Sequence, residues 1–203
     1  MHWLVPIILA APAVAVALFV TFSSDHSPTY GFWVFSVYGL AIGIIEAVTA
    51  AWIGTSLGRT GSIAKAVVHL VAGGAALATV LLQVGALDRE QATALLAITM
   101  GITFLITGII DAGVGAKLKD VDRYARDWMT TGIVGVIAAI AMVMVPADYA
   151  IEFTPEPGVT GYLTASIIII GIFGAALAIN GVLQVLGGIS LAPQRETKTK
   201  AEA

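Results

Sequence analysis

The sequence predicts an all-α, polytopic membrane protein that crosses the bilayer six times. Three observations carry this prediction: 58% of the 203 residues are hydrophobic, only 11% are charged, and the mean hydropathy is +0.94. A typical soluble domain has about 25% charged residues, because it must cover its surface with them. The composition therefore excludes a soluble globular domain, a nucleic-acid-binding protein and a disordered chain.

Long runs without a charged residue locate the spans. A span takes about 20 apolar residues, and backbone groups in lipid must be hydrogen-bonded within the protein, which favours helices. In chain order we expect helices near residues 3–22, 30–57, 62–85, 90–116, 127–146 and 160–189. Together they form one transmembrane domain over residues 1–190, and residues 191–203 form a polar cytoplasmic tail.

Capping residues mark the ends of several helices. Ser27 followed by Pro28 fits an N-cap with proline at the first helical position. Asp88 resembles the first residue of a capping box at the start of the fourth helix, and Asp127 is expected to cap the fifth helix. Residues 146–159, which follow the fifth helix, are expected to form an acidic loop.

Lysine and arginine predict the direction of the chain, because cytoplasmic loops carry an excess of them. One end of the predicted bundle, including the first turn of the third helix and the tail, holds nine: Arg59, Lys65, Lys117, Lys119, Arg123, Arg126, Arg195, Lys198 and Lys200. The other end holds Arg89 and six acidic residues: Asp25, Asp88, Glu90, Asp148, Glu152 and Glu156. We therefore expect a multi-pass protein of the cell (inner) membrane with both termini in the cytoplasm.

A short pattern recurs in the even-numbered helices. Each copy has a glycine, two aliphatic residues and then an acid or an amide, at Gly43–Glu46, Gly108–Asp111 and Gly181–Gln184. Seven positions before each glycine stands a small residue: Ser36, Gly101 and Gly174. The copies are 65 and 73 residues apart. This predicts three tandem helical hairpins with parallel, pseudo-threefold internal repeats, and these glycines, with Gly39, are interpreted as close helix contacts.

Glu46 is the sharpest functional signal in the sequence, because it falls inside the second predicted span. A charge at the centre of a span costs about 2.5–3.5 kcal/mol on insertion scales, so Glu46 must be paired, protonated or facing water. Turn counting places polar residues of the other helices at a similar depth. We expect one polar cluster in the inner leaflet, made of Glu46, Lys65, His69, Asp111, Asn180 and Gln184, with Lys65 at its mouth.

Two interpretations of this polar cluster stay open. Intramembrane carboxylates near a histidine are typical of proton or substrate paths. The same residues could instead form interhelical hydrogen bonds that fix how the hairpins dock, each contributing about 0.6 kcal/mol. The sequence has no cysteine, only three histidines and no catalytic motif, so we expect no catalytic residue, no metal and no cofactor.

Three sequence features resemble the HdeD-like acid-resistance membrane proteins, a family of six-helix proteins. They are the segment Gly101-x6-Gly108-Ile-Ile-Asp111-Ala, the segment Trp128-x6-Gly135 in a helix that ends at Pro146, and residues 21–27. The likeness extends to about residue 190, although the acidic loop at 146–159 is longer than in that family. The resemblance implies an inner-membrane protein linked to survival at acid pH, and it supplies no catalytic residues.

Three classes of function are compatible with these features. The first is a stress-response or structural membrane protein without a defined reaction, which predicts a dry and tightly packed centre. The second is a small channel or transporter for protons or a small solute, which predicts a water-accessible cavity lined by Glu46, His69 and Gln184. The third is an accessory subunit of a larger membrane complex or, the least favoured alternative, a membrane enzyme. The expected partners are the lipid bilayer and a second copy or a larger complex, and no nucleic acid.

Overall fold

The computed structural model describes residues 2–82, 87–156 and 159–193. Six α-helices account for most of the chain, and their bounds are α1 Leu4–Phe22, α2 Pro28–Thr49, α3 Ser56–Leu82, α4 Arg89–Leu118, α5 Ala125–Val143 and α6 Ala165–Leu191. A short 3-10 helix, η1 (Ala50–Trp52), extends α2, and two strands, β1 (Ala150–Glu156) and β2 (Val159–Thr164), precede α6. The prediction of six helices long and apolar enough to cross a membrane is confirmed.

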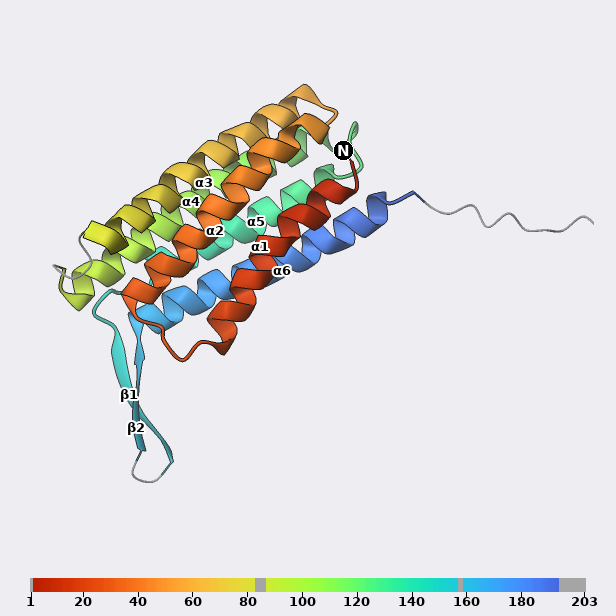
Figure 1. Ribbon diagram of the computed structural model, residues 1–203. Coiled ribbons are helices and arrows are strands. Elements are labelled where there is room, and N and C mark those ends of the chain that lie inside the picture. Colours follow the sequence, from red (N-terminus) through yellow and green to blue (C-terminus); the bar gives the residue numbers. More distant parts are fainter. Residues whose placement is uncertain (1, 83–86, 157–158, 194–203) are drawn as a thin grey trace, which may run out of the picture.

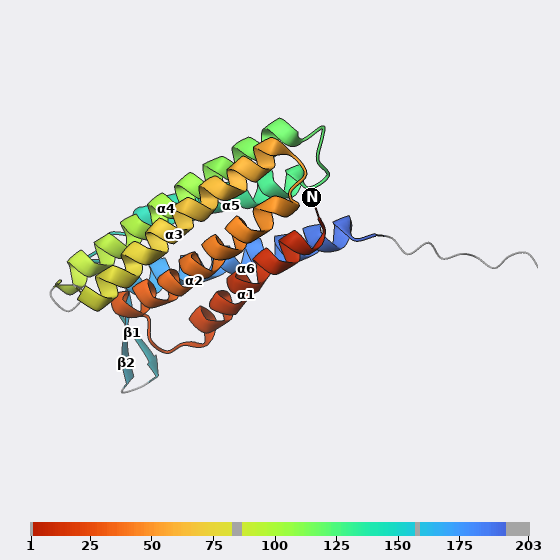
Figure 2. The same ribbon diagram turned by 45° about the horizontal axis from the view of Figure 1, so that its top comes forward.

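The helices form one antiparallel bundle around an inner trio. Each helix packs beside its neighbours in the order α1, α2, α3, α4, α5, α6, and α6 closes the ring against α1. Within the ring, α2, α4 and α6 also contact one another. The closest packing joins α2 to α3, α4 to α5 and α6 to α1, and α1 and α6 lie side by side in both views (Figures 1 and 2). The two helices of each predicted hairpin are therefore less closely packed than helices from successive hairpins.

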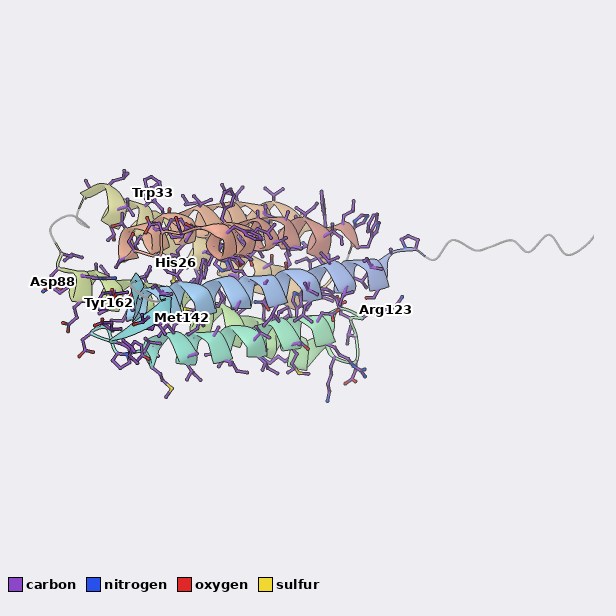
Figure 3. All side chains as sticks on the ribbon, turned by 90° about the horizontal axis from the view of Figure 1, so that it is seen from below. His26, Trp33, Asp88, Arg123, Met142 and Tyr162 are labelled. Atoms are coloured by element: carbon purple, nitrogen blue, oxygen red, sulfur yellow. The ribbon has the colours of Figure 1, made fainter. Side chains whose placement is uncertain are left out.

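The two ends of the bundle differ in charge. The start of the chain and the end of α6 lie at one end, called here the terminal end (Figure 1). The opposite end, called here the hairpin end, carries β1 and β2 (Figure 1). Asp88 and Tyr162 lie at the hairpin end and Arg123 lies at the terminal end (Figure 3). The cations predicted at Arg195, Lys198 and Lys200, and residues 194–203 of the predicted tail, lie outside the described residues.

The segments Ala150–Glu156 and Val159–Thr164 correct the expectation of a purely helical protein with an acidic loop. They form an antiparallel hairpin in which Ala150 pairs with Thr164 and Phe153 pairs with Gly161, and it projects away from the bundle (Figure 1). The segment is rich in β-branched and aromatic residues, which favour strands. As a result, α6 begins at Ala165 and not near residue 160.

Other helix ends also differ from those expected. α2 was expected to continue to residue 57, but α3 already begins at Ser56, because the Thr55 hydroxyl accepts a hydrogen bond from the Gly58 N–H at 3.3 Å and so caps a new helix. Asp127 does not cap α5: the N-cap residue is Tyr124, and Asp127 lies in the first turn.

The two other predicted caps are present. Ser27 accepts from the Tyr30 N–H at 3.2 Å, with Pro28 at the first helical position. Asp88 accepts from the Gln91 N–H at 2.8 Å.

Apolar side chains face both inward and outward. The larger buried cluster contains Phe35, Met100 and Phe173, each 0% exposed, and fills most of the bundle. A smaller cluster around Ile53, Leu118 and Trp128 closes the terminal end. Many large apolar side chains are exposed on the outside of the helices, such as Phe19 and Val71. A bundle that is apolar on both its inner and outer faces suits surroundings of lipid.

The six glycines interpreted as helix contacts all lie where another helix comes close. An added Cβ would meet Gly73 from Gly39, Leu70 from Gly43, Val143 from Gly101, Gly132 from Gly108, Val20 from Gly174 and Val14 from Gly181. At Gly108 the nearest atom is the backbone carbonyl oxygen of Gly132, at 2.7 Å. Because backbone atoms cannot rotate away, any side chain at this position pushes α4 and α5 apart.

We predict that Gly108→Ala lowers the stability of the folded protein by about 1–3 kcal/mol, the usual effect of overpacking a core. The matched control is Gly113→Ala on the same helix, where an added Cβ meets nothing within 4 Å. Alanine has a better helix propensity than glycine, so the control should be neutral or stabilising. Thermal unfolding in detergent compares the two variants, and equal melting temperatures would contradict the packing assigned to Gly108.

Candidate functional site

Four helices bring the six residues of the polar cluster to one depth of the bundle. Glu46 comes from α2, Lys65 and His69 from α3, Asp111 from α4, and Asn180 and Gln184 from α6. Glu46 precedes the end of η1 by six residues, and Asp111 precedes the end of α4 by seven. With a rise of 1.5 Å per residue, these carboxylates lie roughly 9–11 Å inside the terminal end. All six side chains line one cavity.

The ammonium group of Lys65 lies between two carboxylates. Its Nζ is 3.0 Å from Oε1 of Glu46 and 2.9 Å from Oδ1 of Asp111, and it donates a hydrogen bond to Oδ2 of Asp111 at 3.1 Å. Lys65 is 8% exposed and Glu46 is 2% exposed. One cation therefore joins α2, α3 and α4 in surroundings from which water is largely excluded.

His69 contacts the second carboxylate oxygen of Glu46. Its Nδ1 lies 2.7 Å from Oε2, a distance typical of a charge-assisted hydrogen bond. The ring of Tyr38 packs edge-on against the imidazole with 5.8 Å between ring centroids. The Ser62 hydroxyl donates to the backbone carbonyl of Glu46 at 3.1 Å. Both oxygens of Glu46 are thus held, one by an ammonium group and one by an imidazole.

The charges of these four side chains do not sum to zero when His69 is neutral. Two carboxylates and one ammonium group leave a single negative charge inside an apolar bundle, where an uncompensated charge is unfavourable. One additional proton removes it, either on the imidazole or on a carboxylate. The contact between Oε2 of Glu46 and Nδ1 of His69 offers such a proton a binding site on either atom.

The cavity beside these side chains is small and partly polar. Its volume is about 40 Å³, which is room for about one or two water molecules. The Asn180 Oδ1 and Gln184 Oε1 atoms are buried and have no hydrogen-bond partner. A buried acceptor without a donor costs free energy of folding. We therefore expect water or another small donor to occupy the cavity beside these two amides.

Sequence reasoning missed several polar residues that line the same cavity. Tyr38 lies two turns before Glu46, Thr107 lies one turn before Asp111, and Thr131 comes from α5. The signal for Thr107 was present in the sequence, because Thr107–Asp111 and Asn180–Gln184 are both polar pairs four residues apart, which face the same side of a helix. Thr131 also has a polar residue four positions away, Asp127, but Asp127 does not line the cavity. The packing of α5 against α4 and α6 brings Thr131 into the cavity.

Comparisons of the chain with protein families, curated proteins and solved structures find no match. Within the described ranges, no group of three or more His, Asp or Glu side chains is placed to hold a metal ion. The side chains of the site can form ion pairs and hydrogen bonds, and they can take up and release protons.

We predict that Lys65→Met destabilises the protein by about 3–5 kcal/mol, the usual result of removing one partner of a buried ion pair. Two carboxylates are then left without their cation, so adding Asp111→Asn should recover part of the loss. Lys117→Met, at an exposed position near the end of α4, is the matched control and should melt like the unmodified protein. If Lys65→Met and Lys117→Met had the same melting temperature in detergent, Lys65 would carry no buried charge pair.

Proposed function

We propose that this chain is a multi-pass membrane protein that binds and releases a proton at Glu46 and His69. The single observation that carries the proposal is the charge of the site: two carboxylates share one buried ammonium group, while His69 contacts the remaining carboxylate oxygen at 2.7 Å. The site is neutral with one extra proton and negative without it. The net charge of the site therefore depends on whether it holds this proton.

The neighbouring groups support Glu46 and His69 as the pair that titrates. Lys65 stabilises both carboxylates, and the side chains that α5 and α6 contribute to the cavity, including Thr131 and Gln184, do not titrate. The phenol of Tyr38 lies against His69. Tyr124 lies at the start of α5. Burial and the nearby charge of Asp111 both raise the pKa of its phenol, which therefore stays protonated and neutral.

The size of the cavity favours a proton over a larger solute. About 40 Å³ accommodates water but no organic molecule. The buried acceptors on Asn180 and Gln184 suit water molecules, which can donate to them and pass a proton onward. The small volume and the buried acceptors therefore support a path for protons more than a path for a small organic solute.

We also propose that the three predicted repeats underlie the site. Each repeated glycine faces a carbonyl oxygen of the helix that follows it around the ring, in the pairs Gly43–Ala66, Gly108–Gly132 and Gly181–Ala10. The acid or amide three residues later is Glu46, Asp111 or Gln184, and all three line one cavity. A pseudo-threefold axis between α2, α4 and α6 would bring equivalent positions together in this way. In this arrangement each repeat contributes one residue of the polar cluster around that axis.

In the orientation that we propose, the terminal end faces the cytoplasm. The described lysine and arginine residues at the surface of that end are Arg59, Lys117, Lys119, Arg123 and Arg126. At the hairpin end, Arg89 is the one such residue in the described part of the chain. Such an excess is typical of the cytoplasmic side. A proton-binding site near the cytoplasmic face of the inner membrane would also suit the survival at acid pH that the HdeD-like resemblance implies.

We predict that Glu46→Gln removes one proton from the uptake measured when purified protein in detergent is taken from neutral to acid pH. The amide has nearly the shape of the carboxyl but cannot titrate. His69→Gln should lower the uptake in the same way, because the proton is shared between these two side chains. Uptake is read with a pH electrode in weakly buffered solution, as the difference from the unmodified protein.

The matched control for this titration is Glu152→Gln in strand β1, where the side chain is exposed. It removes one exposed carboxylate outside the polar cluster, so it gives the loss of uptake that a solvated glutamate causes. Identical uptake curves for Glu46→Gln and the unmodified protein, with the bundle still folded by circular dichroism, would refute a titrating role for Glu46.

A further inference from the structure

A second cavity lies between the polar cluster and the terminal end. It has a volume of about 10 Å³, close to the least that can hold one water molecule. Gly58, Gly61 and Ser62, in the first turns of α3, form part of its wall, and Trp128 of α5 lies on another side. An added Cβ would meet Trp128 at 2.7 Å from Gly58 and Val114 at 2.8 Å from Gly61, so side chains at these positions would crowd the wall of this cavity.

Lys65 and Asp111 separate the two cavities. Among the described residues they are the only ones that line both the larger cavity and the smaller one. Their ion pair, with Nζ and Oδ1 2.9 Å apart, therefore stands between the proton-binding pair and the terminal end. Lysine carries its charge on a flexible stem of four carbons, so a rotation of this side chain can join the cavities without moving a helix.

The opposite side of the polar cluster is closed by packed rings. Phe173 lies edge-on against Phe35 and Phe104, with 5.8 Å between ring centroids in both pairs. Phe35 and Phe173 are 0% exposed, as is Met100 of the same cluster. The side chains of this apolar seal, defined by Phe35, Met100, Phe104 and Phe173, carry no hydroxyl, amide or charged group. The buried hydroxyls beside it in sequence, Ser36 and Thr103, donate to backbone carbonyls of their own helices.

We infer that the site exchanges its proton with the compartment at the terminal end alone, and that the Lys65–Asp111 ion pair is the gate. The inference rests on the proposed function for its ligand, a proton carried by water. When Nζ of Lys65 parts from Asp111, water from the smaller cavity reaches the larger one and a proton passes between that water and Glu46 or His69. When the ion pair closes again, the proton is held between the gate and the apolar seal.

Access from each side of the membrane tests this inference without any measurement of proton uptake. The chain contains no cysteine, so a single introduced thiol has no background. Ser62→Cys places the thiol in the smaller cavity, Gln184→Cys places it in the larger cavity, and Met100→Cys places it in the apolar seal. The probe is silver ion, which is small and binds thiols. It is added to one side of sealed vesicles, and the thiols left free are counted with a fluorescent maleimide after denaturation.

Two further cysteines identify the two sides of the vesicles. Lys119→Cys lies at the terminal end, just after α4, and Asp148→Cys lies at the hairpin end, just before β1. Vesicles in which silver added outside protects only one of these two thiols have a single orientation. The same preparation then serves for the three test positions.

We expect silver to protect Ser62→Cys from the terminal side, to protect Gln184→Cys from that side more slowly, and to leave Met100→Cys free from both sides. Adding Lys65→Met to Gln184→Cys should speed its protection from the terminal side several-fold, because the gate is lost. Asp111→Asn serves the same purpose if Lys65→Met does not fold. Faster protection of Gln184→Cys from the hairpin side, or an unchanged rate in both gate variants, would overturn the inference.

The two proposals can fail separately. If the silver pattern is as expected but Glu46→Gln leaves proton uptake unchanged, the gate stands and the proton site is wrong. If Glu46→Gln abolishes the uptake of one proton but Gln184→Cys is reached equally from both sides, the proton site stands and the one-sided gate is wrong.

Discussion

The contact of one ammonium group with two carboxylates, inside a bundle that is apolar on both faces, is the interaction on which this structure depends. Lys65 lies 3.0 Å from Glu46 and 2.9 Å from Asp111, and each partner comes from a different helix. None of the three charges is tolerable alone in such surroundings. The docking of α2, α3 and α4 at this depth is therefore tied to the pairing of these side chains.

Close helix packing makes that contact both feasible and obligatory. Glycines at positions such as Gly43 and Gly108 let backbones approach until an added Cβ would collide with the next helix. The same closeness excludes bulk water, so the charges must satisfy one another. It also leaves the Asn180 and Gln184 oxygens without protein partners. A cavity of about 40 Å³ suits a proton carried by water better than a bulky solute.

Much of the architecture could be predicted from the sequence, because membrane helices follow simple rules of length and hydropathy. Glu46 could be identified as the residue most in need of a partner, and Lys65 and His69 as candidates, from depth alone. The depth of a residue along its helix does not define the direction in which its side chain points, however. Lys65, expected at the mouth of the cluster, lines the cavity on the terminal side and also bridges Glu46 and Asp111. Depth alone could not give this bridge, which the flexible stem of lysine makes possible.

Other features were missed from the sequence. The strands β1 and β2 carry β-branched and aromatic residues that favour strands, but acids such as Glu152 suggested a loop. The position of Thr131 in the cavity follows from how α5 packs, which no local pattern encodes. Local propensity thus accounts for the helices, and long-range packing accounts for the site.

The most direct test of the central claim is the protonation of His69 itself. Nitrogen NMR of protein labelled at histidine distinguishes the imidazole from the imidazolium, and His2→Gln with His26→Gln leaves His69 as the sole signal. We expect the Nδ1 signal of His69 to be that of a nitrogen hydrogen-bonded to a carboxylate, and to change in Glu46→Gln, because the 2.7 Å contact with Oε2 of Glu46 is lost. A His69 spectrum that is the same with and without the Glu46 carboxylate would contradict a proton shared between the two side chains.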